Sequence, residues 1–327
     1  MNPPRARHFL LLLLACAVSG FAYGQAARDY PSKAVRIVIP FAPGGGTDTL
    51  TRIVAQKMSE AWGQPVVADN RPGAGGTLAS DIVAKSAPDG YTLLMGMIAT
   101  HAMSPHLYKN LPYDAIKDFA PVTLAVVSPN ILVVHPSVPA AGIGELIAFA
   151  RANPGKLNYG SAGTGSPAHL AGELFKSLAK VDVVHVPYKG GAPAVTALLA
   201  GEVSMMFAGP IESLPQVRSG KLRALGVTTP KRYDSARELP TMLEAGLTGF
   251  ELTQWNGLFA PAGTPPEVVA KLNAEVTRVL GLDDVKERLL KAGFEPAPST
   301  SKEFTDFVKR DYDRWGTVIR NAGIRLD

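Results

Sequence analysis

The chain has 327 residues, of which 46% are hydrophobic, and its formal net charge is +5. That length exceeds the usual size of one domain, and the hydrophobic fraction is sufficient for two buried cores. Basic residues alternate with acidic ones, as in segments 286–288 and 309–311. The sequence therefore lacks the clustered positive charge of nucleic-acid-binding proteins, and we expect no nucleic-acid partner.

The first 26 residues have the pattern of a secretory signal peptide. Arg5 and Arg7 precede an apolar run at 9–18, which is shorter than the roughly 20 residues of a membrane span, and small residues follow at 22–27. Cys16, the single cysteine of the sequence, lies in this run, so cleavage near residue 26 would remove it. We expect export to the periplasm. A lipoprotein acylated at Cys16 is the weaker alternative, because Leu14 is bulky for that processing site.

Residues 30–127 alternate between strand and helix patterns. Short runs rich in β-branched residues at 35–40, 66–68, 91–97 and 119–127 predict buried strands. Apolar residues at helical spacing predict helices at 47–62 and 77–85. This order indicates a mostly parallel sheet with helices on both faces and a ligand site at the carboxyl ends of the strands.

A second unit with the same alternation begins near residue 128. Strands are predicted at 131–134, 157–159, 181–186, 203–207 and 222–228, with helices at 143–152, 166–178, 192–199 and 211–219. The extended segment 250–259 then leads to helices at 265–280, 283–292 and 301–321. We therefore predict an α/β protein of two lobes. Domain 1 comprises 27–127 plus 228–327, domain 2 comprises 128–227, and two connections between them form a hinge.

Glycine-rich turns follow several predicted strands and open helices. In the turn from Pro43 to Asp48, three glycines allow backbone angles that other residues avoid. Such a turn presents N–H groups to one point, where the positive end of the helix favours an anion. Similar turns occur at 70–77, 160–166, 188–193 and 207–210. If these turns share one cleft, they predict capture of a carboxylate between the lobes.

The candidate ligand-binding residues lie in these turns and in the expected cleft walls. They are Phe41, Ala42, Gly44, Gly45, Thr47, Asp48, Ser161, Ala162, Thr164, Gly165, Ser166, Tyr188, Gly190, Gly209 and Trp255. Each has a structural alternative. Asp48 also suits the cap of a helix, and Trp255 or Phe41 also suits a hydrophobic core. The hydroxyl groups of 161–166 either bind the ligand or fold their own turn.

Catalytic motifs are poorly matched. Asp182, the acid of the next predicted strand, stands at the start of that strand and not at its far end, which argues against a dinucleotide site. Tyr159 stands where a nucleophile elbow around Ser161 requires glycine, and the six histidines lack metal-ligand spacing. We predict no catalytic residue and no metal site. The alternative is a secreted hydrolase that uses Ser161 with His169 or His185.

Six motifs are spread over nearly the whole mature chain: YPSK at 30–33, VIPFAPGGGTD at 38–48, NRPGAGG at 70–76, DGYTL at 89–93, VPYKGG at 186–191 and FAPAGTP at 259–265. Their combination resembles the Bug (TctC-like) family, the periplasmic substrate-binding proteins of tripartite tricarboxylate transporters. The resemblance is specific for the family and leaves the ligand open among di- and tricarboxylates, amino acids, aromatic acids and amides.

This resemblance implies a two-lobed periplasmic binding protein of the type II-like class, which closes over a small organic acid and delivers it to membrane permease subunits. It also implies that loops 41–48 and 161–166 grip a carboxylate from opposite lobes, partly through bridging waters. The family resemblance further implies a monomer without metal or cofactor. A ligand-presenting component of a membrane sensor is the alternative within this class.

Overall fold

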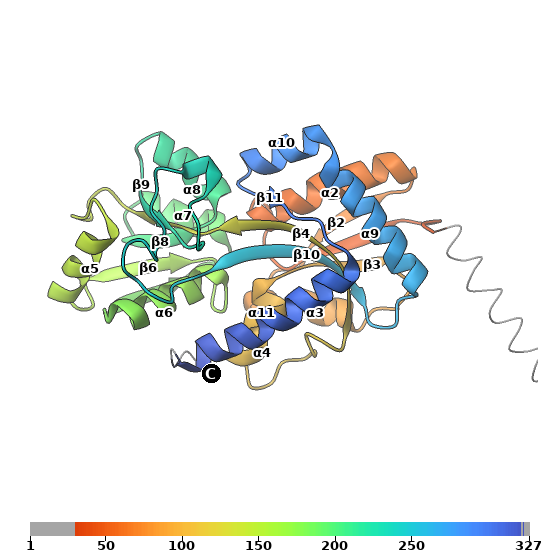
Figure 1. The fold of residues 1–327 in the computed structure, drawn as a ribbon, viewed down its shortest axis with the longest axis horizontal. Helices are drawn as coiled ribbons and strands as arrows, with labels where there is room; N and C mark the ends of the chain where they lie inside the picture. The colour runs from red at the N-terminus through yellow and green to blue at the C-terminus, as the bar shows by residue number, and fades with distance from the viewer. Residues whose placement is uncertain (1–29, 322, 324–327) are drawn as a thin grey trace, which may run out of the picture.

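The computed structural model describes residues 30–321 and 323, and the expected signal peptide lies outside them. Two lobes are visible, one containing β5 to β9 and the other the remaining strands, with long strands running across the boundary (Figure 1). Each lobe has its own sheet, flanked by helices. The expected two-lobed α/β architecture is confirmed.

The first-lobe sheet has the order β11-β4-β10-β3-β1-β2 in the described part of the chain. Its strands are β1 (Val35–Ile39), β2 (Val66–Asn70), β3 (Thr92–Met97), β4 (Phe119–Pro129), β10 (Thr253–Pro261) and β11 (Glu295–Pro296). Strand β1 pairs in parallel with β2 and β3, whereas β10 is antiparallel to β3 and β4, and β11 to β4. The sheet is thus mixed, which corrects the expectation of a mostly parallel one. A chain that leaves a lobe on β4 and returns on the neighbouring β10 must reverse direction.

The second-lobe sheet has the order β7-β6-β8-β5-β9. Its strands are β5 (Ile131–Val134), β6 (Leu157–Ser161), β7 (Val183–Pro187), β8 (Met205–Ala208) and β9 (Arg223–Val227). Strand β6 is parallel to β7 and β8, whereas β5 is antiparallel to β8 and β9, so this sheet is mixed as well. Strand β5 follows β4 directly along the chain, without a helix between them. The direction of β5 is therefore set by β4 and not by a helical crossover.

Helices cover both sheets. The first lobe carries α2 (Gly46–Trp62), η1 (Ala74–Gly76), α3 (Thr77–Ala84), η2 (Ala99–Met103), α4 (Ser104–Leu107), α9 (Pro266–Gly281), α10 (Asp283–Lys291) and α11 (Ser301–Asn321). The second lobe carries α5 (Ile143–Ala152), α6 (Pro167–Ala179), α7 (Gly191–Leu199), α8 (Pro210–Arg218) and η3 (Asp234–Ala236). The long predicted helices are confirmed. The pair η2 and α4 was not predicted.

Hydrogen bonds join the two connections where they cross between the lobes. Asn130 N–H donates to Thr228 Oγ1 at 2.9 Å, and Thr228 N–H donates to the carbonyl oxygen of Asn130 at 3.0 Å. Leu252 N–H in turn donates to the Thr228 carbonyl oxygen at 2.9 Å. The chain segments around residues 130, 228 and 252 therefore meet at one place on the boundary between the lobes.

The segment 229–250 stays beside the second sheet after β9. Val227 N–H donates to the Pro240 carbonyl, Met242 N–H donates to the Val227 carbonyl, and Phe250 stacks on Phe207 at a centroid distance of 5.6 Å. We therefore propose that the second lobe extends to about residue 252, beyond the boundary at 227 that the sequence suggested.

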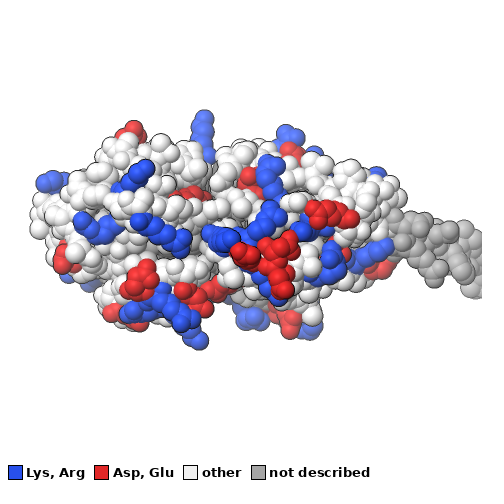
Figure 2. All heavy atoms as spheres, turned by 90° about the horizontal axis from the view of Figure 1, so that it is seen from above, with Lys and Arg blue, Asp and Glu red and all other residues white. Residues whose placement is uncertain are grey.

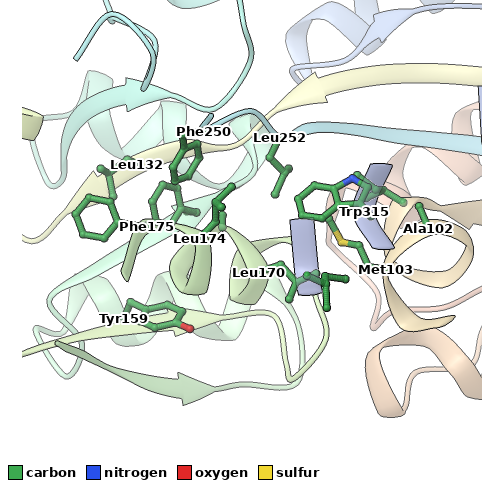
Figure 3. Packing of buried hydrophobic residues seen from close by; sticks show 14 of the residues in the cluster. Ala102, Met103, Leu132, Tyr159, Leu170, Leu174, Phe175, Phe250, Leu252 and Trp315 are labelled. Atoms are coloured by element: carbon green, nitrogen blue, oxygen red, sulfur yellow. The ribbon is translucent and has the colours of Figure 1, made fainter. Parts of the chain in front are cut away.

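Buried apolar residues from both lobes form one continuous cluster. Figure 3 shows Tyr159, Leu174 and Phe175 on the second-lobe side and Met103 and Trp315 on the other, with further members between them. Separate clusters lie beneath α2 and α9 in the first lobe and beneath α7 and α8 in the second. The lobes are thus joined by packing as well as by the chain connections.

The surface carries both signs of charge. Figure 2 shows Lys and Arg interspersed with Asp and Glu over one face, with large uncharged areas between them. Among the described residues, no helix has the length and apolar character that a membrane span requires.

Candidate ligand-binding site

A pocket lies between the lobes and encloses about 800 Å³, counted with its opening to solvent. Its first-lobe wall consists of the turn after β1, the start of α2, part of β10 and the segment around Phe294. Its second-lobe wall consists of β8 and the turns that open α6, α7 and α8. Ser128 and Asn130 line it at the crossing.

The start of α2 forms the first-lobe wall. Gly44 adopts a φ of 88°, in the left-handed region that favours glycine, and Gly45 is an N-cap without a side-chain cap. The first N–H groups of a helix have no partners within the helix, and the helix dipole makes this end positive. The turn can therefore bind an anion through backbone groups.

Asp48 holds this turn in shape. Its carboxylate accepts hydrogen bonds from Gly44 N–H, Arg52 Nε and Asn70 Nδ2, each at 3.0 Å. Burial alone would raise the pKa of Asp48, but the bonds from Arg52, Gly44 and Asn70 outweigh it and hold that pKa below its ordinary value. Asn70 Nδ2 also donates to the Phe41 carbonyl at 2.9 Å. Asp48 lines the pocket, yet its oxygens are committed to these protein groups.

Strand β10 supplies polar side chains that sequence reasoning missed. Gln254 and Asn256 line the pocket, and Asn256 Nδ2 donates to Thr47 Oγ1 at 3.1 Å. Successive side chains of a strand point to opposite faces, so Trp255 between them points away. It is 1% exposed, and its Nε1 donates to Asp311 Oδ2 at 2.7 Å. Trp255 thus follows the core alternative. The feature of the sequence that pointed to Gln254 and Asn256 was the alternation of side chains between the two faces of the strand within 253–257.

The second-lobe wall is built from helix starts. Gly190 and Gly209 are the N-caps of α7 and α8 and have no side-chain caps. Pro167 and Pro210 occupy the first helical positions of α6 and α8, where a missing N–H is tolerated. Together with α2, four helices begin at the pocket. Their dipoles all favour a negative group there.

The hydroxyl groups of Ser161 and Ser166 in the turn at 161–166 bond to groups of the protein. Ser161 is fully buried, and its Oγ lies 2.7 Å from His185 Nε2. Ser166 caps α6 by accepting the His169 N–H at 3.3 Å. Thr164 is exposed, outside the pocket lining. From this turn, Ala162 reaches the pocket.

Two stacked imidazoles lie beneath this turn. The rings of His169 and His185 are 4.0 Å apart, and Gly165 N–H donates to His169 Nδ1 at 3.2 Å. Burial, and then the neighbouring His169, lowers the pKa of His185 to about 4. Burial also lowers the pKa of His169. Ser161 and His185 thus form a Ser–His pair. The hydrolase alternative requires access to the Ser161 hydroxyl, but this residue is buried outside the pocket lining.

The predicted site residues therefore divide into two groups. Those that line the pocket are Phe41, Ala42, Gly45, Thr47, Asp48, Ala162, Gly190 and Gly209. Those outside its lining are Gly44, Ser161, Thr164, Gly165, Ser166, Tyr188 and Trp255. Gly44 and the residues around 161–166 shape the turns that carry the lining residues. Tyr188 belongs to the same support, because its N–H donates to the Ser161 carbonyl at 3.0 Å.

Glu212 is the pocket residue that sequence reasoning missed most clearly. It stands in the first turn of α8, and the N–H groups of Gly46, across the lobe boundary, and of Glu212 itself act on its carboxylate and favour the charged form. Burial raises the pKa of Glu212 above its ordinary value, against the effect of these two donors. The signal in the sequence was an acid two residues after the Gly-Pro of 209–210.

The architecture and pocket can be compared with known proteins. The family model described as "Tripartite tricarboxylate transporter family receptor" (TctC) matches residues 50–324. The chain belongs to the TctC receptor family. Among TctC relatives, the "UPF0065 protein in tcbD-tcbE intergenic region" of Pseudomonas sp. (strain P51) is 42% identical over 319 residues, covering 97% of this chain and 94% of that protein.

Solved TctC-like structures share the fold. Rpa4515 of R. palustris with adipate has a TM-score of 0.87 at 39% identity, covering 91% of this chain and 100% of that one. MatC from Rhodopseudomonas palustris with bound malate has a TM-score of 0.84 at 38% identity, covering 89% of this chain and 100% of that one. The periplasmic binding protein BugD has a TM-score of 0.86 at 35% identity, covering 91% of this chain and 100% of that one. The expected Bug (TctC-like) family and the periplasmic-binding-protein fold are confirmed. TctC proteins are substrate-binding components rather than an enzyme family.

Proposed function

We propose that this protein captures a small carboxylate-bearing molecule between its lobes and delivers it to the membrane permease subunits of a tripartite tricarboxylate transporter. The observation that carries the proposal is the pocket at which α2, α6, α7 and α8 all begin. Helix starts stabilise a carboxylate through their N–H groups and dipoles, and those of α2, α7 and α8 have no side-chain cap. Two structural relatives are named with the carboxylates adipate and malate, which supports this ligand class.

The mechanism follows from the two lobes. The α2 turn would hold the ligand from one side and the starts of α6 to α8 from the other. A ligand that makes contacts with both walls favours the closed arrangement over an open one. In the present conformation the walls already meet, since a Cβ on Gly45 of the first lobe would lie 3.7 Å from Glu212 Oε1 of the second, and a Cβ on Gly75 would lie 2.9 Å from the Thr164 carbonyl.

A substitution that fills the pocket tests the proposal. Ala162 lines the pocket and is partly exposed, so Ala162→Phe should block the ligand without disturbing the core. Wild-type protein should be stabilised in a thermal-shift screen of carboxylates and amino acids, by about 2.7 kcal/mol when the ligand is at 100 times its dissociation constant. Ala162→Phe should lose this stabilisation and the calorimetric signal. Ala200→Phe, at an exposed position of the same lobe, is the matched control and should retain both.

The setting of the protein belongs to the same proposal. We place it in the periplasm as a monomer that needs no metal or cofactor, with a mature N-terminus near residue 27. N-terminal sequencing of the periplasmic fraction and light scattering measure these two properties. A co-purifying permease supports transport, whereas a co-purifying sensor kinase supports the ligand-presenting alternative.

The proposal also excludes turnover. Wild-type protein and Ser161→Ala should hydrolyse a p-nitrophenyl ester at the same background rate. A rate that depends on Ser161 would instead favour the hydrolase.

A further inference from the structure

Two residues that line the pocket each carry a buried side-chain oxygen without a hydrogen-bond partner among the described residues: Glu212, at Oε2, and Asn130, at Oδ1. The orientation of the Asn130 amide is fixed, because its Nδ2 donates to the Phe207 carbonyl at 2.6 Å. Asn130 Oδ1 is therefore a hydrogen-bond acceptor, and Glu212 Oε2 is one when its carboxyl group is ionised. Buried acceptors without donors are unfavourable, so the pocket wall is complete when a ligand supplies donors.

The Glu212 carboxylate occupies a confined position at the lobe boundary. A Cβ added to Gly209 would lie 2.5 Å from Oε2, and one added to Gly191 would lie 2.9 Å from Oε1. The carboxylate thus fits between the glycine-bearing starts of α7 and α8, and a Cβ added to Gly45 at the start of α2 would lie 3.7 Å from Oε1. It takes up a place that the helix dipoles make favourable for an anion.

The lining offers this carboxylate no counter-charge. Among the described residues that line the pocket, the charged ones are Asp48 and Glu212, and none is Lys, Arg or His. Asp48 is already paired with Arg52, which stands outside the lining. Burial accordingly raises the pKa of Glu212. A positively charged group of the ligand would supply the counter-charge for Glu212 that the residues of the pocket lining do not provide.

We propose that the pocket takes an acid that also carries a protonated amine, that Glu212 and Asn130 receive the amine, and that Glu212 determines this specificity. The inference rests on the proposed function as a carboxylate receptor and narrows its ligand class. An ammonium group has three N–H donors and a positive charge, so it satisfies both acceptors and pairs with Glu212. A dicarboxylate of the same length brings a second negative charge toward Glu212, and like charges at short range disfavour each other.

Calorimetry with matched ligands tests this assignment. The probes are the standard amino acids, 5-aminopentanoate and 6-aminohexanoate, with glutarate and adipate as the dicarboxylates of equal length. Wild-type protein should bind at least one amino-bearing acid about tenfold or more tighter than either dicarboxylate. Glu212→Gln keeps the size of the side chain and an acceptor oxygen but loses the charge. It should weaken the best amino-bearing ligand by about tenfold and strengthen the dicarboxylates.

Two further variants separate charge from structure. Glu212→Asp retains the charge and should recover part of the preference for the amine. Glu238→Gln, at an exposed position outside the pocket lining, should leave every affinity unchanged. Unfolding of each ligand-free variant shows whether it is folded.

The pH dependence gives an independent readout. Asp48 and Glu212 are the titratable groups of the described lining, and Asp48 is held ionised by Arg52. Protonation of Glu212 should therefore weaken an amine ligand as the pH falls. A dicarboxylate whose affinity rises on acidification and exceeds that of every amine probe would show that neutral Glu212 donates to an acid, and would overturn the inference.

The possible failures are distinct. If a dicarboxylate binds wild-type protein most tightly, or if Glu212→Gln leaves the ratio of affinities unchanged, the assignment of Glu212 is wrong while the carboxylate receptor stands. If no acid of either kind binds, the proposed function fails as well.

Discussion

Asp48 shows how one buried charge shapes a binding turn. Its carboxylate joins Gly44, Arg52 and Asn70, and so fixes the glycine turn to the start of α2 and to the end of β2. Asp48 lines the pocket, but its hydrogen bonds go to groups of the protein and stabilise the ligand-free fold. Its loss should therefore reduce the stability of the protein whether or not the ligand is present.

We expect Asp48→Asn to lower the free energy of unfolding by about 1–3 kcal/mol, because the amide places N–H donors opposite groups that are themselves donors. The pKa of Asp48 is lowered in the fold, so its contribution is present above the ordinary value of 3.8 and is lost as the pH falls through the folded value. Urea unfolding at pH 7 and at pH 3 should thus show a difference from wild type that shrinks in acid. Asp313→Asn, at an exposed position of α11, should change stability by less than about 0.5 kcal/mol.

Individual site residues were predicted where the backbone decides their role. The glycine turn at 43–48 was recognisable because its residue types allow few other conformations. Gln254 and Asn256 were not, because alternation along a strand shows that two faces exist and does not show which one meets the ligand. Glu212 was missed because an acid in the first turn of a helix is ordinary there, and only the opposing lobe makes it unusual.

At the scale of elements, α6 and the strands beside it carry a pH-sensitive group. His185 on β7 faces His169, Glu173 and Lys176 on α6 and Tyr159 on β6. Glu173 accepts a bond from the Tyr159 hydroxyl at 2.7 Å and pairs with Lys176. Burial and the neighbouring His169 keep His185 neutral, since the pKa of His185 falls to about 4.

The sign of the effect on stability follows from this lowered pKa. Between the ordinary value of 6.5 and about 4, the unfolded chain binds a proton at His185 that the folded chain excludes. Stability should therefore fall as the pH decreases through this window, by up to about 3.5 kcal/mol at about 1.4 kcal/mol per pKa unit. His185→Asn should give a flatter profile in urea unfolding between pH 7 and pH 4. An unchanged slope would show that other groups control the acid sensitivity.

The long helices were predictable because one side of each is buried. In α11, for example, Phe304, Val308, Trp315 and Ile319 are buried at helical spacing. The pair η2 and α4 escaped prediction, since all five residues of η2 are buried and a helix enclosed on every side has no apolar face to reveal it.

At the scale of the molecule, the direction of the strands was the part of the fold that the sequence misrepresented. Alternating strands and helices indicate parallel pairing, and they do so correctly for β1 to β3 and for β6 to β8. The reversal of β10 arises from the passage between lobes, and a local pattern contains no record of that passage. The number of lobes was nevertheless predictable from length and repetition.

The cluster shared between the lobes predicts cooperative unfolding. Leu170 and Phe250 of the second lobe belong to the same buried cluster as Met103 and Trp315 of the first. Neither lobe can lose its packing without exposing the other. Differential scanning calorimetry of the ligand-free protein should show one transition, with equal calorimetric and van't Hoff enthalpies. Two resolved transitions would show that the lobes unfold independently.

The same cluster has a consequence for the energetics of closure. If the lobes rotate about the crossing strands so that the shared cluster stays packed, the contacts that separate are those between the start of α8 and the first lobe, such as Ile211 against the cluster beneath α2 and α9. We therefore expect the open and closed populations to differ by little free energy. A ligand shifts such an equilibrium by its differential affinity for the two states, so modest binding is sufficient to close the protein and modest contact with a partner is sufficient to release the ligand.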